Sequence, residues 1–206
     1  MMDKSVPYKD IVMVMDSNKI LLTPAPTLPE GFSFRFFSGE EDIPHWCRIE
    51  TAVDEFDTEE DARTHFAEEF LPHINELKTR CIFILNRESQ PIATAMCWLS
   101  NSEIPGRLHW VAVCPEYQGL GLGKAVTQKA VNICAELHHG NKMWLSTQTW
   151  SYRAVMMYHK LGFNMLKSEV ELGGKYSYIK DFDSAIEVLA GLLQPSEVLQ
   201  LKNTAV

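Results

Sequence analysis

The sequence predicts an α/β fold in which helices flank a central sheet, and three observations support this prediction. Two apolar runs, Cys81–Leu85 and Ile92–Leu99, are joined by the polar turn NRESQP, which is typical of two antiparallel strands. After Leu108, strand patterns and amphipathic helix patterns alternate along the chain. The first such strand leads into its helix through a loop with three glycines, within Leu108–Lys124.

The composition is that of an ordinary globular protein, with 46% apolar and 22% charged residues in 206. This length is enough for one well-buried domain. The net charge of −8 argues against nucleic acid as a partner, because nucleic-acid binding needs clustered lysine and arginine. No apolar stretch approaches the roughly 18 residues of a membrane span, and no signal peptide is recognisable, so neither membrane insertion nor secretion is indicated.

The cysteines predict a reducing environment. They are odd in number, lack C-x-x-C spacing and mostly lie in apolar runs, so we interpret all of them as reduced core thiols. They are Cys47, Cys81, Cys97, Cys114 and Cys134. Reduced thiols are typical of the cytoplasm, which is the predicted location.

The first 30 residues are predicted to be an appendage. The apolar runs Ile11–Met15 and Lys19–Leu22 flank Asp16-Ser17-Asn18, a pattern that favours a β-hairpin. The proline-rich connector Thr23–Gly31 follows. The predicted division is therefore an N-terminal segment at 1–30, a main domain at 31–182 and a helical tail at 183–206.

Two helices are predicted after the strand-like run Phe32–Phe37. Ser38 and Glu41 form a possible capping box for a helix that ends near Val53. Thr58 caps a second helix that ends near Leu71, before a proline. Further strands are expected at 108–113, 143–147, 163–166 and 175–179, and further helices at 121–137 and 152–161. The amphipathic tail 184–201, broken by Pro195, is expected to pack on its own domain or on a second subunit.

The stretch Leu108–Lys124, LHWVAVCPEYQGLGLGK, predicts an anion site. Its apolar strand ends before Pro115, and Gly119, Gly121 and Gly123 let the backbone approach a ligand where a Cβ would clash. A helix that starts there points unpaired N–H groups and the positive end of its dipole at the same spot. A phosphate group would fit there.

Spacing separates the phosphate motifs that compete for this loop. A Walker A motif fails because Ala125 follows Lys124, and the dinucleotide pattern fails because Lys124 stands where the third glycine belongs. What remains is Q-x-x-G-x-G, at Gln118, Gly121 and Gly123. This resembles the pyrophosphate-binding motif of the GNAT superfamily of acyl-CoA N-acyltransferases, with glutamine in the place often held by arginine. The alternative is a glycine-rich turn with no ligand.

A second stretch resembles the same superfamily. The motif N-x-x-A-x-x-x-Y-x-x-x-G-F is matched at Ala154, Tyr158, Gly162 and Phe163, with Ser151 in place of the asparagine. Both motifs occur in the family's order, and the resemblance covers roughly residues 32–180. It implies a mixed, mostly antiparallel sheet of six to seven strands flanked by helices and splayed at the acyl-CoA site.

The resemblance implies an enzyme that moves an acetyl group from acetyl-CoA to a primary amine by direct attack, through a tetrahedral intermediate. Acetyl-CoA is the co-substrate, and no metal is implied, because His138 and His139 are adjacent on a helix end and the cysteines lack ligand spacing. The residues implied to bind the cofactor are Val111, Ala112, Val113, Gln118, Gly119, Leu120, Gly121, Leu122, Gly123, Lys124, Ser151 and Tyr158. The alternative function is a non-catalytic acyl-CoA-binding sensor or regulatory module.

Three residues are candidates for proton transfer. In this family the tyrosine at the position of Tyr158 protonates the departing coenzyme A thiolate, although a core tyrosine is the other interpretation. His109 precedes Val111 by two residues, so a regular pleat would put both on one face, and a histidine there serves as base in similar enzymes. Glu103 is the second candidate base, or else a solvated loop acid. By analogy the backbone N–H of Val111 would meet the oxyanion.

The acceptor is expected to be a small-molecule or peptide amine that binds around the first two helices. The acidic side chains there could hold a cationic amine, or they could simply cap helices: Asp54, Glu55, Asp57, Glu59 and Glu60. The sequence does not choose among amines, and the protein is expected to be a monomer or a homodimer.

Overall fold

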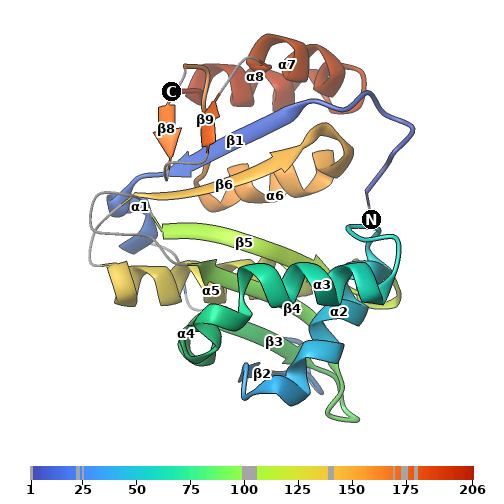
Figure 1. Cartoon of the computed structure of the whole chain (residues 1–206). Coiled ribbons are helices and arrows are strands. Elements are labelled where there is room, and N and C mark those ends of the chain that lie inside the picture. The colour runs from blue at the N-terminus through green and yellow to red at the C-terminus, as the bar shows by residue number, and fades with distance from the viewer. Residues whose placement is uncertain are drawn as a thin grey trace. The chain divides into compact units, whose positions relative to one another are not determined.

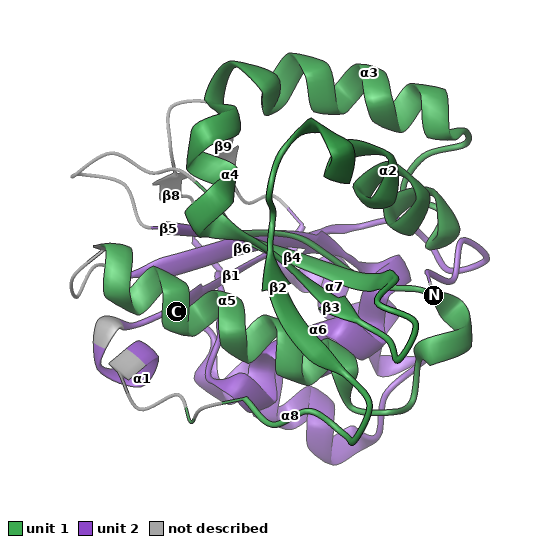
Figure 2. Ribbon diagram, turned by 90° about the horizontal axis from the view of Figure 1, so that it is seen from below, with its two compact units in different colours: residues 1, 24–98, 108–137 green, residues 2–23, 99–107, 138–206 purple. Residues whose placement is uncertain are grey.

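The computed structural model describes residues 2–21, 24, 26–98, 106–138, 142–168, 170–172, 176–178 and 181–206. The chain forms two compact units, shown in green and purple in Figure 2. Unit 1 comprises residues 1, 24–98 and 108–137, and unit 2 comprises residues 2–23, 99–107 and 138–206.

The described residues of unit 1 form four strands and four helices. The strands are β2 (Ser33–Phe36), β3 (Cys81–Leu85), β4 (Pro91–Trp98) and residues 108–113 of β5 (Gly106–Val113). The helices are α2 (Ile43–Ala52), α3 (Glu59–Glu69), α4 (Ile74–Arg80) and α5 (Leu122–His138), with short 3₁₀ turns at Glu40–Asp42, Leu71–His73 and Pro115–Tyr117. Within this unit α2, α3 and α4 lie on one face of the strands and α5 lies on the other (Figures 1 and 2).

The antiparallel pair predicted at the centre of unit 1 is confirmed. β3 pairs with β4 from Cys81↔Met96 to Leu85↔Pro91, and every residue of β4 is buried. The turn between them is organised by Asn86, whose Oδ1 accepts hydrogen bonds from the backbone N–H groups of Glu88 (3.1 Å) and Gln90 (2.9 Å). A polar side chain that satisfies turn N–H groups is a common reason for asparagine at such a position.

One of the two predicted helix caps is confirmed. Thr58 Oγ1 accepts a hydrogen bond from the Asp61 N–H at 3.1 Å and begins α3. The capping box of Ser38 with Glu41 was wrong, because Ser38 donates both its N–H and its hydroxyl to Asp42 Oδ2 instead. Arg35 holds that carboxylate in place with contacts of 2.8 and 2.6 Å, which makes Asp42 the stronger acceptor.

Unit 2 contains the first two residues of β5 and the remaining elements. Its strands are β1 (Asp10–Met15), β6 (Met143–Gln148), β7 (Asn164–Met165), β8 (Val170–Leu172) and β9 (Tyr176–Tyr178). Its helices are α1 (Ser17–Leu21), α6 (Tyr152–Leu161), α7 (Phe182–Ala190) and α8 (Pro195–Thr204), with a 3₁₀ turn at Thr149–Ser151. β8 and β9 form a separate antiparallel pair. The strand expected at 175–179 corresponds to β9, and both ends of that range lie outside the described residues.

The N-terminal hairpin was wrong. β1 pairs antiparallel with β6 and β7, strands that follow more than a hundred residues later. The second apolar run forms helix α1, because the backbone carbonyl of Asp16 accepts hydrogen bonds from the N–H groups of Lys19 and Ile20. Partners so distant in sequence leave no local signal, so a hairpin pattern misled the prediction. The division at residues 30 and 182 stays a prediction.

The strand order confirms the fold class. The seven strands of the main sheet run β2-β3-β4-β5-β6-β1-β7 (Figure 1). β1 pairs antiparallel with β6 and β7, and β3 pairs antiparallel with β2 and β4, whereas β5 and β6 are parallel at Gly106↔Met143 and Arg107↔Trp144. A mixed, mostly antiparallel sheet flanked by helices was expected. The splay implied by the resemblance stays a prediction.

The C-terminal tail packs within unit 2, as the first of its two expected outcomes. α7 packs on β1 and α8 packs on β7. The last residue is bound as well, because Val206 donates its N–H to the Met165 carbonyl and accepts from the Lys167 N–H. Among the helices of the described residues, none is long and apolar enough to cross a membrane.

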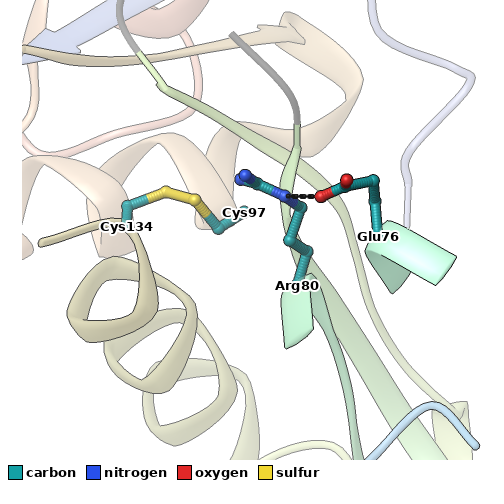
Figure 3. Close-up of a disulfide and its surroundings, with 4 residues drawn as sticks. All are labelled: Glu76, Arg80, Cys97 and Cys134. Atoms are coloured by element: carbon teal, nitrogen blue, oxygen red, sulfur yellow. Dashed lines mark hydrogen bonds and ion pairs between the residues drawn. A yellow bond between two sulfur atoms is a disulfide. The ribbon is translucent and has the colours of Figure 1, made fainter. Parts of the chain in front are cut away.

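A disulfide in unit 1 corrects the prediction that all cysteines are reduced. Cys97 on β4 is bonded to Cys134 on α5, with the two Cα atoms 5.5 Å apart (Figure 3). The two cysteines are 37 positions apart, so no short-range spacing could have indicated the pair. The other three thiols are free and buried. Burial raises the pKa of Cys47 to about 11 and that of Cys81 to about 12, so neither is a reactive thiolate at neutral pH.

Candidate active site

The glycine loop of unit 1 has the backbone conformation that its glycines predicted. Gly119 and Gly121 have φ angles of 79° and 81°, in the left-handed region that favours glycine. At both positions, apart from the glycine and its two neighbours in the chain, no atom of the described residues lies within 4 Å of the place that a Cβ would take. Gly123 lies inside α5 with no positive φ, so only two of the three glycines are required by conformation.

The loop opens directly onto the start of α5, a helix of 17 residues. Gln118 closes the loop against β5, because its Nε2 donates a 2.9 Å hydrogen bond to the carbonyl of Val113. Val113 was expected to offer its backbone to the cofactor arm, and its carbonyl already serves the loop. A long helix whose first N–H groups face an open glycine turn is an arrangement that binds phosphate.

A pocket of about 390 Å³ lies beside this loop, within unit 1. Part of its wall comes from the N-terminal connector and part from the start of α5. It is lined by Thr27, Leu28, Pro29, Leu120, Gly121, Lys124, Ala125 and Gln128. Lys124 is exposed and supplies a positive charge at the wall, which suits a phosphorylated ligand.

His109 lies in a cluster with two residues of α3. Its Nε2 is 3.1 Å from Oε1 of Glu69, and Nε2 of His65 is 2.8 Å from Oε2 of the same carboxylate. We call these three side chains the His–Glu–His cluster. The His109 side chain is only 11% exposed. Glu69 therefore bridges two imidazoles, one on a strand and one a helical turn before it.

The charge of Glu69 follows from these contacts. Burial raises the pKa of its carboxyl, but the contacts with His109 and His65 lower it by more, so the net pKa lies well below its ordinary value. Glu69 is therefore ionised at neutral pH. An ionised carboxylate only accepts hydrogen bonds, so Nε2 of His109, which hydrogen-bonds to it at 3.1 Å, carries a hydrogen.

The strand is irregular next to His109. Trp110 has a φ of 48°, an uncommon and strained conformation for a bulky residue. Its ring lies 5.0 Å from that of His65 while the preceding His109 contacts Glu69, so two successive side chains of β5 both meet α3. Regular alternation, on which we placed His109 and Val111 on one face, therefore fails here.

Aromatic side chains surround the cluster. The Trp110 ring stacks on Phe56 at 5.3 Å, and Trp46 lies 5.3 Å from it in a T-shaped arrangement. Phe70 contacts both His109 (6.1 Å) and Trp98 (4.7 Å). These rings bury His109 more than its partners, because the side chains of His65 and Glu69 remain 35% and 28% exposed.

A second carboxyl, Glu50, is buried on α2, one turn after Trp46. Only 1% of the residue is exposed, and its Oε1 has no hydrogen-bond partner among the described residues. Burial and then the charge of Glu55 raise the pKa of Glu50 well above its ordinary value. The indole nitrogens of Trp46 and Trp110 also lack partners within the described part of the chain. Such clustering of unsatisfied polar atoms is uncommon in proteins.

Ser151 and Tyr158 lie in unit 2, on either side of the start of α6. Ser151 occupies the N-cap position of α6, but its side chain makes no capping hydrogen bond. Tyr158 is buried, with its ring 6.1 Å from that of Phe163. The predicted C-terminal glycine is confirmed, because Gly162 follows the helix with a φ of 111°.

The remaining predicted residues divide into two groups. Glu103, the second candidate base, lies outside the described residues. The acidic side chains expected near the acceptor are all exposed, and two of them occupy the first turn of α3. They are Asp54, Glu55, Asp57, Glu59 and Glu60. Their role in binding an amine stays a proposal.

Sequence reasoning missed His65, Glu69 and Glu50. The spacing of His65 and Glu69, four residues apart on a predicted helix, indicated that they could pair. Nothing in the sequence indicated that His109, 40 residues after Glu69, completes the cluster. Among the described residues, no group of three or more histidine, cysteine or acidic side chains could hold a metal ion.

Residues 45–163 match the family model described as the acetyltransferase (GNAT) family. A GCN5-related N-acetyltransferase from Sphaerobacter thermophilus is similar in structure, with 20% sequence identity and a TM-score of 0.59 over 77% of this chain and 49% of that chain. A GCN5-related N-acetyltransferase from Kribbella flavida is 19% identical in sequence, with a TM-score of 0.52 over 76% of this chain and 54% of that chain. A GNAT-family acetyltransferase from Colwellia psychrerythraea is 14% identical in sequence, with a TM-score of 0.56 over 80% of this chain and 55% of that chain.

This chain spans about half the length of these solved structures. At such identities the likeness shows the fold alone. Among curated proteins, no match to the chain is found.

Proposed function

Because the chain belongs to the acetyltransferase (GNAT) family, we propose that it is an acetyl-CoA-dependent N-acetyltransferase that acts on a primary amine. The observation that carries this proposal is the glycine loop. Gly119 and Gly121 turn in the left-handed region before a long helix, with open space where side chains would otherwise stand. Such a loop fits the pyrophosphate of coenzyme A, and Lys124 offers a charge beside it.

In the proposed reaction, acetyl-CoA supplies an activated acetyl group as a thioester. An ammonium has no lone pair, so His109 or Glu103 first removes a proton from the acceptor, directly or through water. The free amine then attacks the thioester carbon, and the N–H of Val111 stabilises the oxyanion of the tetrahedral intermediate. As the C–S bond breaks, Tyr158 protonates the departing thiolate, which prevents the reverse attack, and the proton that the acylated nitrogen then loses restores the tyrosine hydroxyl through solvent.

Removing the proposed acid tests this scheme. Tyr158→Phe should lose about 10²-fold or more in kcat, with little change in the dissociation constant for acetyl-CoA, because the hydroxyl acts only on the leaving group. Steady-state kinetics and calorimetry measure the two quantities. Tyr152→Phe, on the same helix, is the matched control and should keep normal turnover. A Tyr158→Phe enzyme as fast as the wild type would exclude this role.

A panel assay separates the enzyme from a sensor. The protein is incubated with acetyl-CoA and with small amines, amino acids or peptide N-termini, and free thiol is followed. Acceptor-dependent thiol release supports the proposed enzyme. Calorimetric binding of acetyl-CoA without release for any acceptor would favour a non-catalytic acyl-CoA-binding module.

The proposed setting is the cytoplasm, with an amine of unassigned identity as acceptor. The Cys97–Cys134 disulfide stands against part of the argument for this location, because disulfides are uncommon in cytoplasmic proteins.

A further inference from the structure

We propose that Glu69 is a positioning residue for His109, through the hydrogen bond to its Nε2, and that His65, in close contact with the other oxygen of the same carboxylate, belongs to the same charged unit. This inference rests on the proposed function, because it assigns the base of that reaction. It also favours His109 over Glu103, which the sequence left undecided.

The geometry supports a shared carboxylate. His109 and His65 approach different oxygens of Glu69, at 3.1 and 2.8 Å, so neither displaces the other. Both residues of α3 lie on one face of the helix, one turn apart, and that face meets β5 at His109. The His109 ring is also fixed by Phe70 (6.1 Å) and Trp110 (5.1 Å). A ring held on several sides has its orientation set before an acceptor binds.

The bond to Glu69 determines which nitrogen acts as base. Glu69 is ionised and can only accept, so Nε2 of His109 carries the hydrogen and Nδ1 is the basic nitrogen of the neutral ring. When the acceptor's N–H bond breaks, the proton forms a bond to Nδ1 and leaves its electron pair on the amine. The imidazolium produced is balanced by the carboxylate, which therefore stabilises the product of proton transfer.

The charged surroundings of His109 determine the direction of its pH dependence. Glu69, on α3, is a charged group in direct contact with His109, and His65 lies against the other oxygen of the same carboxylate. The rings of Phe70 and Trp110 against it carry no charge, and His73 lies beyond Trp98, at 6.2 Å from that indole. A negative carboxylate favours the protonated imidazole. Removing it should let His109 lose its proton at lower pH.

The decisive comparison is the pH profile of kcat/KM for three forms of the full chain. In Glu69→Gln the ascending limb should move to lower pH by roughly one unit. The plateau should fall about tenfold, because the ring loses its fixed tautomer and orientation. Glu68→Gln removes the same charge from the neighbouring exposed position of α3 and should match the wild type. The acceptor's own titration is common to all three and cancels in the comparison.

Glu69→Asp keeps the negative charge. The ascending limb of its kcat/KM profile should therefore stay at the wild-type pH, although the plateau of kcat/KM falls. This outcome would separate positioning from a general loss of structure. The proposal would be overturned if the ascending limbs of the pH profiles of kcat/KM were the same for Glu69→Gln and Glu68→Gln.

A second measurement does not depend on turnover. Nitrogen-15 NMR of the imidazoles reports the tautomer and the titration of His109 in each variant. The expected result is hydrogen on Nε2 of His109 in the wild type, and a His109 ring that loses its proton at lower pH in Glu69→Gln than in the wild type or Glu68→Gln. Hydrogen on Nδ1 in the wild type would overturn the proposal. If no acceptor releases thiol, the proposed function fails, and the NMR result still decides whether Glu69 holds His109.

Discussion

Glu50 is the residue whose surroundings are most at odds with its chemistry. A carboxyl on the buried side of α2 has one oxygen without a partner among the described residues, and the aromatic rings nearby offer no compensating positive charge. Burial and the charge of Glu55 favour the protonated form, as the raised pKa shows. The folded protein therefore binds this proton more tightly than the unfolded chain does.

The sign of the resulting pH dependence follows from linkage. Because the pKa is higher in the folded state, the wild type loses stability as the pH rises above the ordinary value of 4.5. Glu50→Gln has no such proton to lose. Its free energy of unfolding in urea should exceed that of the wild type at pH 7.5, and the difference should shrink toward pH 4.5.

The exposed Glu68→Gln serves as the control for Glu50→Gln and should change little at either pH. A Glu50→Gln protein that is less stable than the wild type at both pH values would show that the carboxylate has a stabilising partner.

At the scale of elements, the loop before α5 depends on two glycines with a positive φ, Gly119 and Gly121. Gly121→Ala places a Cβ in the open space of the loop, at a φ of 81° that an alanine rarely adopts. Acetyl-CoA affinity measured by calorimetry should fall about tenfold or more, since losing one good anion contact costs about 1.5 kcal/mol or more.

Gly191→Ala is the matched control for the loop, because Gly191 follows α7 with an ordinary φ of −79°. Equal affinities for Gly121→Ala and Gly191→Ala would mean that the loop does not hold the cofactor.

The β3–β4 turn is a second element with a clear dependence on one residue. Asn86 is buried, accepts two backbone hydrogen bonds within the turn and donates one to the Tyr117 hydroxyl at 2.9 Å. Asn86→Ala leaves these groups unpaired and should cost about 1–3 kcal/mol of unfolding free energy, measured by urea denaturation. Asn75→Ala, at an exposed position of α4, should cost much less, and a similar loss in both would contradict the role assigned to Asn86.

For the whole molecule, the disulfide affects two measurable quantities: the number of reactive thiols in the unfolded chain and the free energy of unfolding. Unfolded in the absence of reductant, the chain should show three reactive thiols, and after reduction five. Because the bond joins cysteines 37 positions apart, its reduction should lower the free energy of unfolding by about 3–4 kcal/mol. In the Cys97→Ser, Cys134→Ser double variant, reductant should have no effect on stability. Five thiols without reductant would show that the bond does not form.

What the sequence could predict depended on how far apart the interacting residues lie. Helix α6 was predicted to its end residues, because Gly162 ends it locally. β1 was assigned to a hairpin because its true partners come after residue 140. For the same reason the glycine loop could be found from spacing alone, whereas the meeting of Glu69 with His109 could not.

The contact of Trp110 with both imidazoles has an optical consequence. Its indole lies 5.0 Å from His65 and 5.1 Å from His109. A protonated imidazole at such a distance quenches indole fluorescence by accepting an electron from the excited ring, whereas a neutral one does so poorly. The emission of this one tryptophan should therefore brighten as the cluster loses its proton, so that the protonation state of the proposed base can be followed in real time without any substrate.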